Sequence, residues 1–250
     1  MKPHVKSIAT KKDGMLSREL ALDILYEVTE NNTNPDLSLK VLLNKKKYSE
    51  IPKRDIALSM MILMSTLRRY NHLEKILLKY LKRPIDKHSK RIHLILLLTI
   101  CQIIYLEIAP HAAVNIAIEL TKKDKKSNKL KNLVNAVLRK VSREIDEILT
   151  DKKDPIDLLP IWLLQKWEKV YSILEIRTIA NTLMEIPPLD LSLTYTHGNQ
   201  KIAEELGGLQ LASGSIRLKN YSHIPDLKYY NDGYWWVQDV SAAIPVKIIE

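Results

Sequence analysis

Cysteine occurs once in this chain, at Cys101, and phenylalanine is absent from all 250 residues. A single cysteine cannot form a disulfide within the chain, which fits a reducing compartment such as the cytosol. Cys101 lies in an apolar run without a cation nearby in the sequence, so we expect a buried, inert thiol rather than a nucleophile. For the absence of phenylalanine beside 11 tyrosines we find no physical reason.

Several motifs that carry chemistry are also missing. The seven histidines are scattered and no Cys-x-x-Cys occurs, which excludes the usual zinc-binding spacings. The chain has no Gly-x-Gly-x-x-Gly, no Gly-rich loop for phosphates and no Gly-x-Ser-x-Gly. We therefore expect no catalytic residue, no metal and no bound cofactor in these 250 residues.

Long hydrophobic segments are absent as well. The most apolar run, residues 92–106, would span about 22 Å as a helix, short of the roughly 30 Å hydrocarbon core of a membrane. It also contains His93 and Gln102. The run predicts the buried central helix of a bundle. No secretory signal is recognisable at the basic N-terminus, so we expect a cytoplasmic protein without a membrane partner.

Charge is distributed unevenly along the chain. Residues 1–150 contain 29 Lys and Arg against 16 Asp and Glu, a net charge of +13, whereas residues 151–250 contain 10 against 13, a net charge of −3. The basic part is therefore the candidate for binding a polyanion, and the second part must have another role.

Helical periodicity dominates the first 150 residues. After a polar, lysine-rich tail over 1–15 that we expect to be disordered, apolar residues recur at spacings of three and four. The helices predicted in this way are 17–29, 36–43, 54–67, 72–81, 90–106, 111–120 and 130–149. Nothing here alternates as a strand does, so the sequence predicts an all-α bundle over 16–150.

The pattern changes beyond a polar linker at 151–155. Two shorter helices are expected, and then segments that alternate with period two, as strands do. The predicted helices are 161–171, 174–185 and 201–206, the last stopped by two glycines, and the predicted strands are 189–195, 215–218 and 234–237. The apolar segment from Val240 has no capping glycine, which suggests a truncated protein. The fold class predicted is mainly α, a bundle followed by a small α/β subdomain over 151–250.

Four tryptophans lie in this second part. Trp162 and Trp167 fall at helical spacing and are expected to anchor a core or a domain interface. Trp235 and Trp236 are neighbours in a predicted strand, so one should face the core while the other could offer a stacking surface.

The most informative segment is 132–143. Its apolar side chains follow helical spacing, and they are Leu133, Val134, Val137, Leu138 and Val141. The residues between them are polar or cationic (Asn132, Asn135, Arg139, Lys140 and Arg143), and the sign turns acidic only at Glu144. One side of this helix is a candidate surface for phosphates, although charge alone is also typical of an ordinary basic helix.

Five motifs in the first part resemble the NusB-like RNA-binding domain. They are residues 18–25 (RELALDIL), 54–57 (RDIA), 67–70 (LRRY), 110–114 (PHAAV) and above all 132–139 (NLVNAVLR). Together with 187–191 (PPLDL) and 233–241 (GYWWVQDVS), their order resembles the bacterial 16S ribosomal RNA cytosine-C5 methyltransferases of the Sun/Fmu (RsmB) family. The resemblance implies a NusB-like bundle, a small α/β subdomain and then a Rossmann-like core that binds S-adenosylmethionine.

The chain departs from that family pattern in what it lacks. The Gly-rich cofactor loop and the two catalytic cysteines that the family implies are absent, and Cys101 is not in a matching motif. After Leu191 the sequence continues Ser-Leu-Thr, where many members have an arginine and an asparagine. We therefore expect RNA binding without methyl transfer from these residues alone.

The expected partner is RNA, with 16S ribosomal RNA as the target that the resemblance implies. The cations selected as phosphate contacts are Arg18, Arg68, Arg69, Lys129, Lys131, Arg139 and Arg143. Each could instead be a surface charge or part of an intrachain ion pair. Two other hypotheses remain open, a stand-alone NusB-like module in transcription antitermination or ribosome assembly, and an inactive gene product.

Overall fold

The structure, a computed structural model, describes residues 13–86, 89–123, 128–150, 154–194, 199–219, 221 and 224–249. It divides into two compact units, Met1–Met184 and Glu185–Glu250. Most of the predicted disordered tail over 1–15 lies outside the described residues. Its last three residues already belong to the first helix, α1 (Asp13–Asn31).

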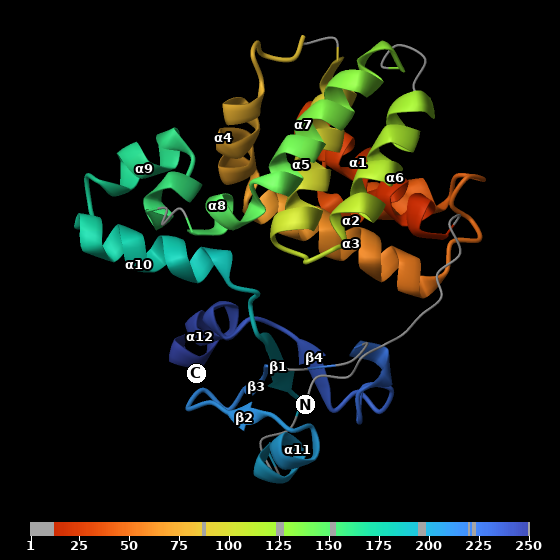
Figure 1. Ribbon diagram of the computed structural model, residues 1–250. Coiled ribbons are helices and arrows are strands. Elements are labelled where there is room, and N and C mark those ends of the chain that lie inside the picture. The colour runs from red at the N-terminus through yellow and green to blue at the C-terminus, as the bar shows by residue number, and fades with distance from the viewer. Residues whose placement is uncertain are drawn as a thin grey trace. The chain divides into compact units, whose positions relative to one another are not determined.

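The first unit is built from a helical bundle (Figure 1). Its other helices, as far as the chain is described, are α2 (Pro35–Leu43), α3 (Lys53–Arg68), α4 (Tyr70–Tyr80), α5 (Lys90–Ile104), α6 (Pro110–Lys123), α7 (Lys131–Arg143) and α8 (Ile145–Thr150). The single helix predicted over 130–149 is wrong in one respect, because it is two helices. Glu144 between them leaves helical geometry at ψ +16° while its N–H still bonds to the Lys140 carbonyl.

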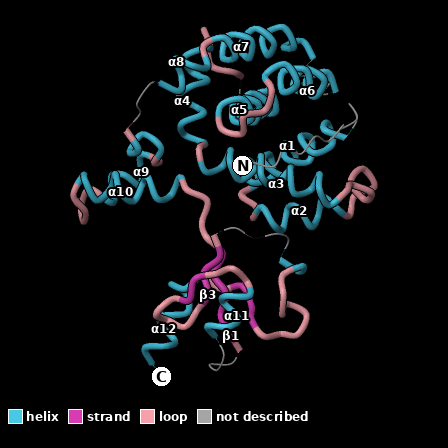
Figure 2. The backbone as a smooth tube through the Cα atoms, turned by 60° about the horizontal axis from the view of Figure 1, so that its bottom comes forward, coloured by secondary structure: helices cyan, strands magenta, loops and turns pink. Residues whose placement is uncertain are grey.

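Helix α5 is the centre of this bundle. It packs against α1, α3, α4, α6 and α7, and Figure 2 shows it enclosed by its neighbours. Twelve of its fifteen residues are buried, including Gln102 and Cys101. The prediction of a buried central helix is confirmed, because a helix that is apolar on every side needs neighbours on every side. In the described part of the chain, no helix is long and apolar enough to cross a membrane.

Asp23 on α1 is the centre of a cluster of charged and polar side chains. Its carboxylate accepts hydrogen bonds from the Tyr48 hydroxyl at 2.6 Å, from the Lys47 ammonium at 3.0 Å and from the Arg91 guanidinium. Burial alone would raise the pKa of Asp23, but these neighbours, Arg91 foremost, hold it below its ordinary value. The cluster therefore fastens α1 to the turn after α2 and to α5.

The lowered pKa of Asp23 predicts a loss of stability in acid. A carboxyl whose pKa is depressed on folding stabilises the fold above its unfolded pKa of about 4, and this contribution disappears as the pH falls through the folded value. Asp23→Asn should lower the free energy of unfolding by about 2 kcal/mol at pH 7 and flatten its decline between about pH 5 and 2. Urea unfolding at several pH values measures this. Asp36→Asn, at an exposed carboxylate, is the matched control, and equal effects of the two would contradict the assignment.

Residues after 150 remain attached to the bundle. The short helices η3 (Pro155–Leu158), α9 (Ile161–Trp167) and α10 (Ile173–Met184) all belong to the first unit. Lys75 on α4 pairs with Asp157 at 2.8 Å, and the Asn71 amide donates to the Leu158 carbonyl at 3.1 Å. The compact units thus divide between Met184 and Glu185, whereas the sequence placed the domain boundary after residue 150.

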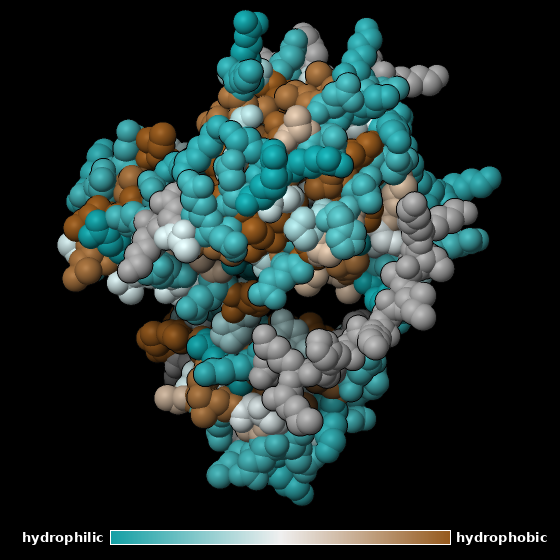
Figure 3. Space-filling model, viewed as in Figure 1, coloured by the Kyte–Doolittle hydropathy of each residue, from teal (hydrophilic) through white to brown (hydrophobic). Residues whose placement is uncertain are grey.

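The tryptophans of α9 differ in burial. Trp167 packs on a small cluster of Leu159, Ile176 and Ala180. Trp162 is 60% exposed, so it is not part of a core, while a place at a domain interface stays a prediction. Hydrophobic side chains gather on the visible surface over α9 and α10 (Figure 3). The two tryptophans are five residues apart, which separates them by about 140° around the helix, so a neighbour that covers Trp167 leaves Trp162 uncovered.

The second unit contains an antiparallel sheet in the order β2-β3-β1-β4. Its strands are β1 (Leu189–Leu193), β2 (Leu209–Gln210), β3 (Ile216–Leu218) and β4 (Trp235–Val237), and its helices are α11 (Asn199–Glu205) and α12 (Val240–Ile249), with the turn η4 (Ile224–Asp226). The two-residue β2 was not predicted, because two residues are too few to show a period. Trp235 is buried and Trp236 is half exposed, which confirms that one of the pair faces the core.

The central strand β1 is buried on both faces. The predicted strand is confirmed for Leu189–Leu193, and its polar residues Asp190 and Ser192 are buried together with its leucines. Asp190 accepts two hydrogen bonds from Arg217 on β3, each of 2.7 Å, and one from the backbone N–H of Val240 at the start of α12. Ser192 donates to Gln238 at 2.8 Å. Both buried polar side chains of β1 thus have partners, which makes their burial tolerable.

Candidate nucleic-acid interface

Helix α7 presents a cationic surface because its apolar residues lie on one side. Val134, Val137, Leu138 and Val141 are buried, and the helix packs on α5 and α6. Its exposed polar side chains are Lys131, Asn132, Arg139, Lys140 and Arg143, and Leu133 and Ala136 are exposed beside them. The amphipathic helix predicted from the sequence is therefore confirmed for Lys131–Arg143.

The exposed cations of α7 are not neutralised. None of Lys131, Arg139 and Arg143 forms an ion pair with a carboxylate in the described ranges, and neither does Lys129 just before them. Some cations elsewhere in the bundle are paired, as Lys90 is with Glu30 and Lys123 with Glu19. Glu144 follows Arg143 directly, but its carboxylate accepts a hydrogen bond from the Tyr80 hydroxyl. Positive charge on α7 thus remains available to an external anion.

Helix geometry separates these cations into two surfaces. Arg139 and Arg143 are four residues apart and therefore lie on one face, opposite the buried side. Lys140 lies on another face, together with Leu133. We call the first surface the arginine face, defined by Arg139 and Arg143. The second borders a groove.

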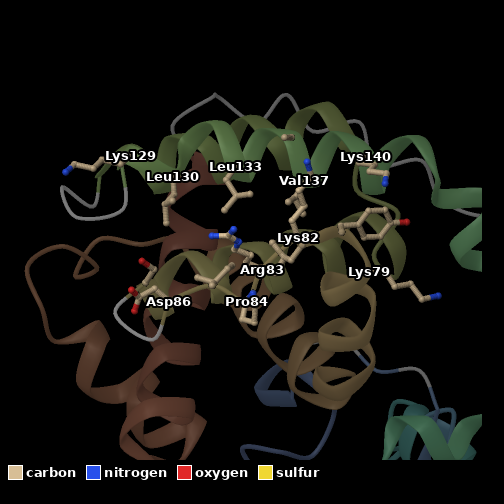
Figure 4. A pocket seen from close by; sticks show the side chains of 15 residues that line it. Lys79, Lys82, Arg83, Pro84, Asp86, Lys129, Leu130, Leu133, Val137 and Lys140 are labelled. Atoms are coloured by element: carbon tan, nitrogen blue, oxygen red, sulfur yellow. The ribbon is translucent and has the colours of Figure 1, made fainter.

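The groove has a volume of about 1140 Å³ and runs between α7 and the segment that joins α4 to α5. In Figure 4, Leu130, Leu133 and Val137 point from the α7 side toward Lys82, Arg83 and Pro84 on the opposite wall. The described residues that line it are Lys79, Tyr80, Leu81, Lys82, Arg83, Pro84, Ile85, Asp86, Ser89, Lys129, Leu130, Leu133, Ala136, Val137 and Lys140. Its floor is mostly aliphatic and its rim is mostly cationic.

One tyrosine closes the end of this groove. The Lys140 ammonium lies 5.4 Å from the centre of the Tyr80 ring, a cation–π distance. Burial, followed by the hydrogen bond to Glu144, raises the pKa of Tyr80 to about 12. Tyr80 is therefore neutral at physiological pH, and both its ring and its hydroxyl have partners within the protein.

Three of the cations selected from the sequence lie away from α7. Arg18 on α1 donates to the Gln102 side chain at 2.9 Å and to the Gly14 carbonyl at 3.0 Å, and burial lowers its pKa. Arg69 lies 4.6 Å from the Tyr105 ring and donates to the Met184 carbonyl at 3.3 Å. Arg68 ends α3 half-buried, and burial, followed by the charge of Arg69, lowers its pKa. Arg18 and Arg69 thus hold helices together, whatever else they contact.

The groove cations Lys82 and Arg83 were missed from the sequence. The signal was present, because Lys79, Lys82 and Arg83 cluster just before Pro84. Leu130, Leu133 and Val137 complete the groove from about 50 residues further along the chain, a proximity that no local pattern reveals.

The structure offers no other evident chemical centre within the residues it describes. No group of three or more His, Cys, Asp or Glu side chains is placed to hold a metal there. Cys101 is fully buried, as expected, and burial raises the pKa of its thiol to about 11. Such a thiol is protonated at neutral pH and is not a nucleophile.

Comparison with known proteins identifies the class to which this bundle belongs. The NusB family model matches residues 15–143, more than half of the chain, and the chain therefore belongs to the NusB family. The predicted fold class, mainly α with a NusB-like bundle and a small α/β subdomain, is confirmed.

The chain is also similar to curated proteins over most of its length. The chain is 28% identical over 235 residues to the Ribosomal RNA small subunit methyltransferase B of Shigella flexneri serotype 5b (strain 8401), and 27% identical to that of Escherichia coli (strain K12). Each alignment covers 90% of this chain and 53% of the relative, so the chain spans about half the length of these curated relatives. The crystal structure of PH0851 shares the fold with a TM-score of 0.56 at 11% identity, covering 97% of this chain and 56% of that one.

Proposed function

We propose that this chain is the RNA-binding part of an S-adenosylmethionine-dependent methyltransferase that modifies a cytosine at C5 in 16S ribosomal RNA in the cytoplasm. The observation that carries the proposal is the un-neutralised arginine face of α7, supported by Lys131. Its guanidinium groups can each take a phosphate in a bidentate manner, which positions RNA without reading its sequence. The relatives, named as ribosomal RNA methyltransferases, supply the substrate class.

The similarity to the methyltransferases also includes the second unit. The alignments span 235 residues, far beyond the 15–143 that the NusB family model matches. A stand-alone NusB-like module would not need residues 185–250 to resemble a methyltransferase. This extent favours the methyltransferase role over the second hypothesis of an antitermination or assembly factor.

Methyl transfer itself is not assigned to residues of this chain. The 250 residues contain no Gly-rich loop suited to S-adenosylmethionine, and Cys101 is too deeply buried to attack a cytosine. The residues present therefore fit neither the cofactor nor the thiolate chemistry that the transfer requires. We place cofactor binding in the part of the relatives that this chain does not match.

A salt titration tests the proposal. A fluorescent single-stranded fragment of 16S ribosomal RNA is titrated with the protein at several salt concentrations, and the logarithm of Kd is plotted against the logarithm of salt. We expect a slope of about 2, because each phosphate contact on a single strand contributes roughly 0.7 and about three cations of α7 take part. Absence of binding at low salt, or a slope near zero, would contradict RNA binding.

A further inference from the structure

The groove beside α7 combines two properties that phosphate binding alone does not require. Its floor is formed by aliphatic side chains, among them Leu81, Ile85, Leu130 and Leu133. Its rim carries Lys82, Arg83, Lys129 and Lys140, and Asp86 is the one carboxylate among the described residues that line it. A ligand that fills the groove must therefore present apolar groups toward the floor and negative charge toward the rim.

The lining favours a polypeptide over a nucleic acid. Unpaired bases are bound chiefly by stacking on open aromatic or guanidinium faces. Tyr80 is the one aromatic residue among the described lining residues, and its ring already faces Lys140 while its hydroxyl bonds to Glu144. Arg83 is the one guanidinium among them, so the groove offers a single plane for stacking and not the series that a strand of bases would use. Branched aliphatic side chains instead complement leucine or isoleucine anchors of a docked helix.

The dimensions of the groove also match a helix. On the α7 side its lining runs from Lys129 to Lys140, which corresponds to about three helical turns or roughly 16 Å. The volume of about 1140 Å³ exceeds the range of about 300–1000 Å³ that is usual for small-molecule sites. An amphipathic helix of three to four turns would place anchors at successive turns along this length.

We propose that the groove between α7 and the α4–α5 segment binds an acidic amphipathic helix of a partner protein. Leucine-type side chains of that helix contact Leu130 and Leu133, and its flanking carboxylates pair with Lys82, Arg83, Lys129 and Lys140. The surface is distinct from the arginine face, so the bundle can hold RNA and a protein partner on different sides of α7. This proposal does not depend on RNA binding by the arginine face.

A designed peptide tests it. The probe is a fluorescein-labelled peptide of about four helical turns, with leucines on one face and glutamates on its flanks. We expect saturable binding to the full chain by fluorescence anisotropy. Leu133→Gln should weaken this binding about tenfold, because one leucine-sized apolar contact is lost. Leu133 is 37% exposed, so the substitution leaves the core intact.

Matched controls separate the groove from general charge. Arg139→Gln combined with Arg143→Gln should change peptide binding less than about twofold, whereas Lys82→Glu combined with Lys129→Glu should weaken it as strongly as Leu133→Gln. A peptide of the same composition, scrambled so that its leucines share no face, should bind at least about tenfold more weakly. Equal binding of the scrambled peptide, or no binding of the designed one, overturns the proposal. So does an RNA oligonucleotide that loses affinity in Leu133→Gln and displaces the peptide, because nucleic acid would then be the occupant.

Discussion

Reversing the charge of Arg139 and Arg143 together is expected to weaken RNA binding about tenfold or more at moderate salt. Two phosphate contacts are lost and two repulsive carboxylates replace them. The slope of log Kd against log salt should fall by about 1.4, because two contacts of roughly 0.7 each disappear. Both side chains are exposed and unpaired within the described chain, so the cost to folding is confined to the helix macrodipole at about 0.5 kcal/mol each. Fluorescence anisotropy with the ribosomal fragment measures both changes.

The control must carry the same change in net charge. Lys45→Glu with Lys46→Glu alters two exposed lysines in the turn after α2, away from α7. This double variant should weaken RNA binding severalfold less than the arginine double. Equal losses in the two variants would mean that net charge alone attracts RNA, and unchanged binding in the arginine variant would exclude the arginine face as the site.

The α7 surface was predictable because its information is local. The apolar residues of 132–143 recur at helical spacing, and that period by itself determines which side is buried and which side keeps Arg139 and Arg143. The break at Glu144 was not predictable. No glycine or proline marks it, and the apolar pattern continues into Ile145 and Ile148 beyond it.

Other predicted contacts depended on distant residues. Arg18 and Arg69 stood in motifs and were selected as phosphate contacts, but the sequence could not show that Gln102 and Tyr105 lie against them. The groove likewise joins the segment around Arg83 to Leu133, and no periodicity connects the two. Local composition thus located the cations, while tertiary packing decided which of them face solvent.

In the second unit, the same distinction applies to Asp190. Alternation predicted the strand that contains this residue, but it could not show which distant groups would contact its carboxylate. In the structure Asp190 is 3% exposed, and its carboxylate accepts hydrogen bonds from the Arg217 guanidinium and from the backbone N–H of Val240. Asp190 therefore connects β1 to β3 and to the start of α12. The hydrogen bonds from Arg217 are the main reason that the pKa of Asp190 lies below its ordinary value, so the carboxylate is charged at neutral pH.

Asp190→Ala is accordingly expected to lower the free energy of unfolding of the second unit by about 3 kcal/mol. The substitution removes the carboxylate that pairs with Arg217, so the guanidinium loses its ion pair. It also leaves the backbone N–H of Val240 without its hydrogen-bond acceptor. The Arg217 side chain is 33% exposed and regains some water, which places the loss at the lower end of the 3–5 kcal/mol range for a broken buried pair. Hydrogen exchange of the backbone amides of Leu189–Leu193 measures this loss, because it reports on this sheet separately from the bundle.

Asp232→Ala, at an exposed aspartate of the same unit, is the control and should leave that exchange unchanged. If both variants exchange alike, the pair contributes nothing to the sheet, and hydrophobic packing of Leu191, Ile216 and Trp235 must be sufficient to hold it.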